Sequence, residues 1–160
     1  MRILGVDPGL GTTGYGAIRA DGSSFRLIEG GVVSTRRADP LEKKLLTLRR
    51  GFDQVIKSCR PEVVILEDLY SHARHPQTAI LMGHARGVLL SVCSERHLPV
   101  FNVPAKRVKK AIIGNGNATK AQIQEMVKHL LRLNQTPCPV DVFDALALAM
   151  SYVYLKGGER

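Results

Sequence analysis

The sequence predicts an α/β fold with a five-stranded mixed sheet and helices on both faces. The first 35 residues contain three short strand-like runs joined by tight turns, which is typical of an antiparallel meander. Two later apolar runs, at 62–67 and 99–103, alternate with helical patterns, and right-handed crossovers would set both strands parallel to the first. A hydrophobic content of 44% over 160 residues suits one domain with a substantial core.

The three N-terminal strands are marked by turn residues. An apolar run over 2–7 ends at the turn Asp7-Pro8-Gly9, which predicts a buried first strand. The run 15–19 predicts a second strand, and Asp21-Gly22 is typical of a hairpin turn. The third strand is expected at about 25–35.

Helical spacing of apolar residues places the remaining elements. A helix is expected to open at Asp39-Pro40 and to end before Pro61. Thr119 is the expected N-cap of a later helix. Further helices are expected at 76–97, 104–113, 119–133 and from 141 to about 155. We therefore predict one domain over 1–156, followed by a flexible tail at 157–160.

Composition indicates a cytoplasmic protein. No apolar run reaches the length of a membrane span, and the N-terminus has no signal-peptide pattern. Cys59, Cys93 and Cys138 are odd in number and show no metal-like pairing, so we expect reduced thiols that serve as packing groups.

The positive charge is concentrated in one region. The net charge is +9, and residues 103–132 hold seven Lys or Arg against one acid. Such a concentration favours a polyanion as partner, because neutralising phosphates releases counterions. The alternative is a solvated face that only aids solubility.

Four carboxylates occupy positions from which they can converge. Asp7 and Glu67 close two strands predicted to be parallel, so both would lie at the sheet edge where α/β proteins bind ligands. Asp141 and Asp144 are three residues apart and share one helix face. Unpaired buried carboxylates are costly, but they are suitable ligands for a hard divalent cation. Taken singly, Asp7 could be only a turn residue and Asp141 only a helix N-cap.

Several segments together resemble the RuvC family of Holliday junction resolvases. The resemblance rests on an ordered set that covers nearly the whole chain: 5–16, 65–67, Gly83-His84-Ala85-Arg86-Gly87, 106–120 and 141–147. It implies a ribonuclease H-like fold. It also implies a homodimeric endonuclease of recombination and DNA repair, which nicks two strands of like polarity in a four-way junction and leaves 5′-phosphate and 3′-hydroxyl ends.

The resemblance also implies the catalytic groups. The family's metal ligands correspond to Asp7, Glu67, Asp141 and Asp144. They would hold two Mg²⁺ per site about 4 Å apart, with Mn²⁺ as a possible substitute. The active-site lysines correspond to Lys109 and Lys120, which would bind or neutralise the scissile phosphate. A branch-migration complex of RuvA and RuvB type is the further partner that the family implies.

Other residues are expected at the DNA. Tyr70 corresponds to an aromatic that stacks on an unpaired base, with packing at the sheet edge as the alternative. Arg74 would help to open base pairs. Plain backbone contacts are expected from Lys106, Arg107 and Lys110. We expect His72 and His75, on the same loop, to lie near phosphate rather than to act as metal ligands.

Two features leave alternatives open. Asp68 adds an acid beside Glu67; we expect it to point to the other face of the strand, but it could perturb the metal site. Gly83 and Gly87 would permit close helix packing, either within the fold or across a dimer.

Three other functions compete with this interpretation. A nuclease of the same fold could act on another substrate, such as structured RNA. Half of a sugar kinase or actin-like ATPase would need a second such domain, which 160 residues cannot supply. A non-catalytic DNA-binding module would gain nothing from four carboxylates, which repel DNA unless a metal neutralises them.

Overall fold

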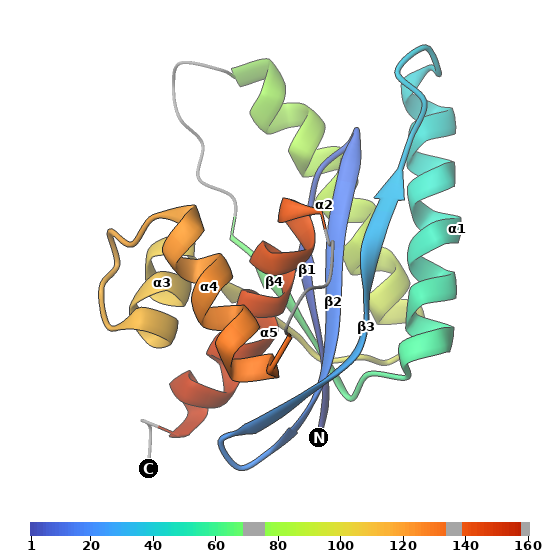
Figure 1. Ribbon diagram of the computed structural model, residues 1–160. Helices are drawn as coiled ribbons and strands as arrows, with labels where there is room; N and C mark the ends of the chain where they lie inside the picture. Colours follow the sequence, from blue (N-terminus) through green and yellow to red (C-terminus); the bar gives the residue numbers. More distant parts are fainter. Residues whose placement is uncertain (69–75, 134–138, 158–160) are drawn as a thin grey trace.

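The computed structural model describes residues 1–68, 76–133 and 139–157. Its sheet has five strands in the order β3-β2-β1-β4-β5 (Figure 1). The strands are β1 (Arg2–Asp7), β2 (Thr12–Asp21), β3 (Ser24–Ser34), β4 (Val63–Glu67) and β5 (Val100–Val103). The helices are α1 (Leu41–Cys59), α2 (Pro76–Glu95), α3 (Ala105–Ile113), α4 (Lys120–Leu131) and α5 (Val140–Gly157).

The sheet is mixed, as the sequence predicts. β1 pairs antiparallel with β2, and β2 with β3, whereas β4 runs parallel to β1 and β5 parallel to β4. β2 is longer than predicted because its ladder with β3 continues from Thr12 to Asp21. The parallel pairing of β1 with β4 brings their carboxyl ends to the same edge of the sheet.

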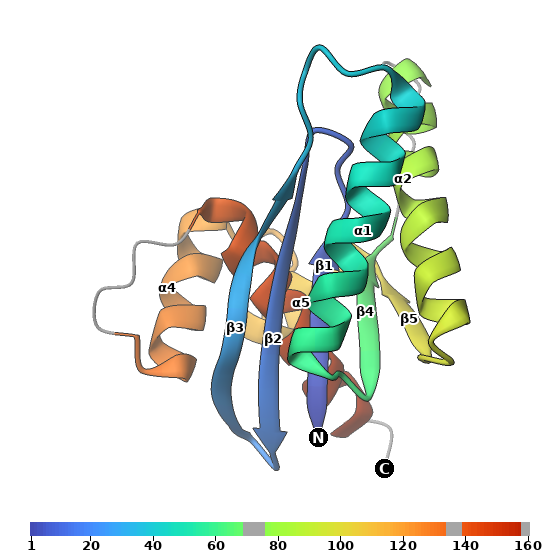
Figure 2. The ribbon, with the colours of Figure 1, turned by 90° about the vertical axis from the view of Figure 1, so that its right-hand side faces the viewer.

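Helices cover both faces of the sheet (Figure 2). Leu4, Val6, Val64 and Leu66 point to the face covered by α1 and α2. The alternate residues of the same strands, such as Ile3 and Ile65, pack in a second core with α3, α4 and α5. This alternation follows from the two-residue period of a strand, and it decides which strand-end residues face which helices.

Local signals set the helix ends. Arg60 follows α1 in the left-handed conformation, directly before Pro61. Gly114 ends α3 with φ of 84°. The predicted N-cap of α4 is confirmed: the Thr119 hydroxyl accepts from the Gln122 backbone N–H, and the Gln122 side chain accepts from the Thr119 N–H.

The last helix, α5, lies directly on the sheet backbone. A Cβ on Gly5 of β1 would stand 1.9 Å from the Ala145 carbonyl oxygen, and one on Gly14 of β2 would stand 2.8 Å from the Asp141 Cβ. Only glycine leaves room for so close an approach. From Val142 to Tyr152, α5 is buried apart from partly exposed Asp144, so the helix fills the space between the sheet and its neighbours.

Several minor predictions can be compared with this fold. Cys59 and Cys93 are buried free thiols, which confirms the packing role expected of them, and burial raises the pKa of Cys93 to about 11. Cys138 lies outside the described residues. No helix of the described chain is long and apolar enough to span a bilayer. α5 extends to Gly157, so the tail beyond it stays a prediction.

Of the two alternatives for Gly83 and Gly87, the prediction of close helix packing within the fold is wrong. A Cβ added at either position meets no atom of residues 1–68, 76–133 and 139–157 within 4 Å, and both residues lie on the outer side of α2. The alternative, packing against a second copy, is therefore the one that remains.

The contact between Gly5 and α5 predicts a large loss of stability on Gly5→Ala. The new methyl would meet a backbone carbonyl that can retreat only if α5 shifts, and overpacking of this kind costs about 1–3 kcal/mol or more. We expect a melting temperature several degrees below that of the natural protein, measured by circular dichroism. Gly11→Ala is the matched control, because a Cβ there meets nothing within 4 Å. Equal melting temperatures for the two variants would contradict the packing.

Candidate active site

Asp7 and Glu67 meet at the carboxyl edge of the sheet. They are the last residues of two neighbouring parallel strands, which pair at Val6 and Leu66 just before them. Asp7 and Glu67 alternate in step with Ile3 and Ile65 on the same strands, so their side chains face α5 rather than α1. Their side chains are close enough for Glu67 to act on the pKa of Asp7. Together with Asp144 they line one cavity of about 170 Å³.

The first turns of α5 bring the other two acids to the same place. Asp144 lines the cavity. Asp141 is not among the lining residues, but its backbone and Cβ lie against Gly14, and Gly14 is the β2 partner of Asp7. Asp141 is the second residue of α5 and so lies inside the first turn rather than at an N-cap. All four predicted acids therefore lie around one edge of the sheet.

Crowding of these acids perturbs Asp7 strongly. Burial, the neighbouring Glu67 side chain and the charge of Asp144 together raise the pKa of Asp7 from 3.8 to about 7. Lys120 acts in the opposite direction. The Asp7 carboxyl thus holds a proton near neutral pH unless additional positive charge arrives, a situation typical of functional carboxylate clusters.

Lys120 is the cation closest to the acids. Its Nζ lies 2.9 Å from Asp144 Oδ2, and its side chain is 70% exposed. The hydrogen bond and charge of Asp144 raise the pKa of Lys120, so the amine is protonated at neutral pH. Lys109, from α3, lines the same cavity. Both predicted lysines are therefore at the carboxylates.

The donor set suits a hard divalent cation. The groups that converge are carboxylate oxygens, which Mg²⁺ and Mn²⁺ prefer, and the raised pKa of Asp7 reflects its burial first and then the negative charge of Glu67 and Asp144. Among residues 1–68, 76–133 and 139–157, however, no three acids, histidines or cysteines are arranged closely enough to hold an ion. Lys120 instead occupies the position beside Asp144, so holding an ion requires small side-chain movements.

The remaining cavity wall was not predicted from the sequence. Apolar residues from three helices complete it: Ala105, Val108, Ile123, Ala147 and Leu148. All of them except exposed Ala105 are buried core residues, and only the fold shows that this part of the core borders the acids. Desolvation by such a wall strengthens electrostatic interactions inside the cavity.

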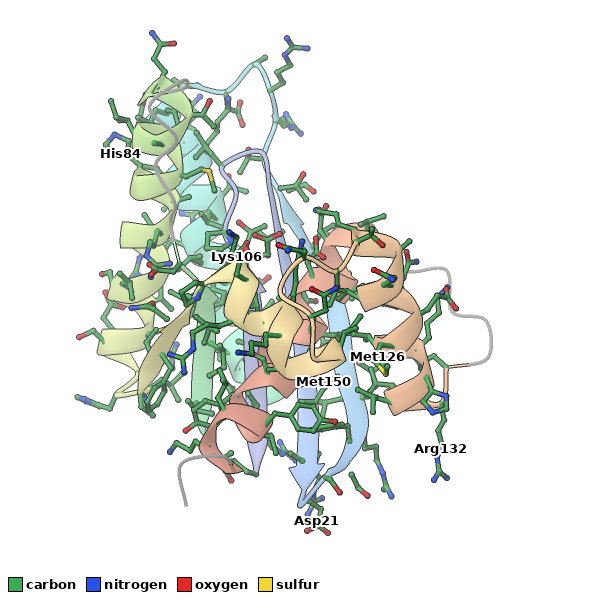
Figure 3. All side chains as sticks on the ribbon, turned by 90° about the vertical axis from the view of Figure 1, so that its left-hand side faces the viewer. Asp21, His84, Lys106, Met126, Arg132 and Met150 are labelled. Carbon is green, nitrogen blue, oxygen red and sulfur yellow. The ribbon has the colours of Figure 1, made fainter. Side chains whose placement is uncertain are left out.

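The other predicted basic residues lie outside the cavity. Lys106, Arg107 and Lys110 are exposed on α3. Because α3 begins directly after β5, its first turn is at the carboxyl edge of the sheet. Figure 3 shows Lys106 at the upper side of α3, well above Asp21 in the hairpin at the lower end of the molecule. The predictions for Tyr70, His72, Arg74 and His75 fall outside the described residues.

Asp68 points away from the acids. It follows Glu67 and therefore faces the side of the sheet covered by α2, where its Oδ1 lies 4.0 Å from Arg86 Nη2. This confirms the orientation expected from strand alternation. Arg86 itself was not predicted to have a role beyond its place in the motif, although an arginine between buried Ala85 and Leu89 is an unusual pattern.

Comparison with known proteins identifies the family. A family model described as "Crossover junction endodeoxyribonuclease RuvC" matches residues 3–152. A protein of that description from Rhodopirellula baltica is 44% identical over 153 residues, which cover 96% of this chain and 86% of the relative.

Solved structures give the same result. The RuvC of Thermus thermophilus, in complex with a Holliday junction substrate, superposes with a TM-score of 0.91 at 31% identity, covering 99% of this chain and 96% of the other. The yeast mitochondrial Holliday junction resolvase Ydc2 shares the fold, with a TM-score of 0.70 at 12% identity, covering 97% of this chain and 80% of its own. The ribonuclease H-like fold expected from the sequence is thus confirmed. On the family model and on these similarities over nearly its whole length, the chain belongs to the RuvC family of crossover junction endodeoxyribonucleases.

Proposed function

We propose that this protein resolves four-way (Holliday) DNA junctions by paired symmetric nicks, in homologous recombination and DNA repair. Family membership makes it an endodeoxyribonuclease, and enzymes of this family depend on metal ions. The observation that carries the proposal is the meeting of strand-end and helix acids at one cavity, in a chain that matches the family from residue 3 to 152.

The acids are proposed as the metal ligands. Asp7, Glu67 and Asp144 line the cavity, and Asp141 lies next to it in the same helix turn as Asp144. Two Mg²⁺ held there would activate a water molecule and steady the leaving 3′-oxygen, and Mn²⁺ would substitute.

Lys109 and Lys120 are proposed to bind the scissile phosphate. Both border the acids, and the exposed side chain of Lys120 is free to swing from Asp144 to a phosphate oxygen. Their charge would stabilise the negative charge that develops on the phosphate in the transition state. The exposed Lys106, Arg107 and Lys110 on α3 are proposed to contact the DNA backbone, and Tyr70 and Arg74 to act at the junction centre.

A homodimer is part of the proposal. A four-way junction has approximate two-fold symmetry, so a symmetric dimer would present one site to each of two strands. The outer side of α2 suits such contact: Ile80 is 61% exposed, Leu90 is 37% exposed, and Gly83 and Gly87 leave open space between them. Cooperation with RuvA and RuvB type proteins belongs to the same proposal.

Loss of one acid should separate cutting from binding. We expect Asp7→Asn to lower the nicking rate of a synthetic four-way junction in Mg²⁺ by at least about 100-fold, the scale for removal of one charge-stabilising group. Junction affinity, measured by gel shift in Ca²⁺ or without metal, should be retained because the basic surface is unchanged.

The natural protein should cut the junction in preference to linear duplex and structured RNA.

Asp21→Asn is the matched control, since the same change falls in the exposed hairpin far from the cavity. Full nicking activity of Asp7→Asn would refute the proposed site. Preferential cleavage of duplex or RNA by the natural protein would refute the proposed substrate.

The raised pKa of Asp7 predicts a pH-dependent stability. In the folded chain that pKa is about 7 against 3.8 for an unperturbed group, so the stability from proton binding is present below pH 4 and is lost as pH rises through 7. Without divalent metal at pH 8, we expect Asp7→Asn to melt at least about 3 °C above the natural protein, which is roughly 1 kcal/mol. The gap should close toward pH 4. A natural protein that is the more stable one at pH 8 in EDTA would contradict this.

Disruption of the outer side of α2 should yield monomers. We expect Ile80→Glu to halve the mass measured by sedimentation velocity at micromolar concentration, because it buries a charge between two copies of the helix. Leu46→Glu is the control, since Leu46 is also exposed (44%) but lies on α1. A monomeric natural protein, or a dimeric Ile80→Glu variant, would exclude this surface as the dimer interface.

A further inference from the structure

Arg86 is a charged side chain in the interior of the fold. Only 9% of the residue is exposed, and its neighbours Ala85 and Leu89 on α2 are fully buried. An arginine stays protonated in proteins, so it retains its charge when buried. A buried charge must be compensated by hydrogen bonds, and the partners of Arg86 therefore indicate what it does.

The guanidinium joins the ends of two strands. Its Nη1 donates to the backbone carbonyl of Glu67, the last residue of β4. Its Nη2 donates to the Asn102 side-chain oxygen on β5 and also lies 4.0 Å from the Asp68 carboxylate. The two terminal nitrogens of Arg86 thus bond two different strands, β4 and β5, at the carboxyl edge of the sheet.

This clamp acts on the residue that reaches the acid cluster. β4 and β5 are paired at Leu66–Asn102 and Glu67–Val103, so the two strands are held side by side just where β4 ends. The side chain of Glu67 points toward α5 and lines the cavity with Asp7, whereas its backbone carbonyl accepts a hydrogen bond from Arg86. The ladder ends one residue later, where the Asp68 N–H donates to the Val103 carbonyl, so Arg86 adds a side-chain hydrogen bond at the last paired residue of β4.

We propose that Arg86 is a positioning residue that fixes the end of β4 and thereby the direction of the Glu67 carboxylate. The inference rests on the proposed role of Glu67 as a metal ligand. Arg86 touches neither the cavity nor the other acids, so it acts through the backbone of Glu67. Asp68 supplies a distant counter-charge on a half-exposed side chain and is a minor partner.

An arginine is needed because two donors must point in fixed directions. The planar guanidinium holds its nitrogens in a rigid fork, whereas the lysine ammonium is a single point charge on a flexible stem. Arg86→Lys therefore keeps the charge but releases either Glu67 or Asn102. The loss of a partner that orients a metal-ligating residue typically weakens metal affinity by about 10–100-fold.

The test measures metal binding directly, without DNA. Mn²⁺ is titrated into the full chain by calorimetry, and free Mn²⁺ is followed by electron paramagnetic resonance. We expect Arg86→Lys to raise the Mn²⁺ dissociation constant about 10-fold. Junction nicking should fall at low Mn²⁺ and recover at saturating Mn²⁺, with unchanged junction affinity. Asn102→Ala, which removes one of the two clamped partners, should give a smaller change in the same direction.

Arg96→Gln is the matched control, because Arg96 also bridges two elements through its guanidinium, but to Asp53 on α1. We expect this variant to lose stability and to keep the natural Mn²⁺ affinity. Suppose the natural protein binds Mn²⁺ and cuts junctions, and both Arg86→Lys and Asn102→Ala bind Mn²⁺ as tightly as it does. The proposed role of Arg86 would then be refuted, while the proposed function would stand. A natural protein that binds no Mn²⁺ would overturn the proposed function as well.

Discussion

The close approach of α5 to the backbone of β1 and β2 is the constraint on which the site depends. Gly5 and Gly14 provide the space, and the helix is buried over most of its length between the sheet and α3 and α4. Because the first turn of α5 passes over the end of β1, Asp141 and Asp144 come down beside Asp7. A helix held farther from the sheet by side chains would leave the helix acids out of reach of the strand acids, whatever the register.

The crowded acids repel one another, and the neighbouring lysine compensates part of their negative charge. Burial and the proximity of Glu67 raise the pKa of Asp7, and the Lys120 amine bonds the Asp144 carboxylate. Cations and a phosphate therefore have complementary places here: positive charge is favoured among the carboxylates, and negative charge is favoured by the lysines around them. On the opposite face of the sheet, Arg86 and Asp68 form a separate charged pair that leaves this balance untouched.

Much of this arrangement was readable from the sequence, for identifiable reasons. Strand and helix periods, the Asp21-Gly22 turn and the Thr119 cap are local signals, and all of them hold in the structure. The meeting of Asp7 and Glu67 followed from parallel strand order, whereas that of Asp144 depended on the last helix packing across the sheet. Two things did not follow. The open environment of Gly83 and Gly87 depends on which side of α2 meets the sheet, and the contacts of Arg86 depend on strands brought together by tertiary packing.

The capping box at Thr119 also orients a second helix toward the cavity. It makes Lys120 the opening residue of α4, just as Val140 and Asp141 open α5. Both helices thus direct their N-terminal ends, with the positive pole of the peptide dipoles, at the same region. At the proposed site, the helix dipoles would therefore add to the attraction that the lysines exert on a phosphate, and a variant that lacks one lysine would retain this contribution.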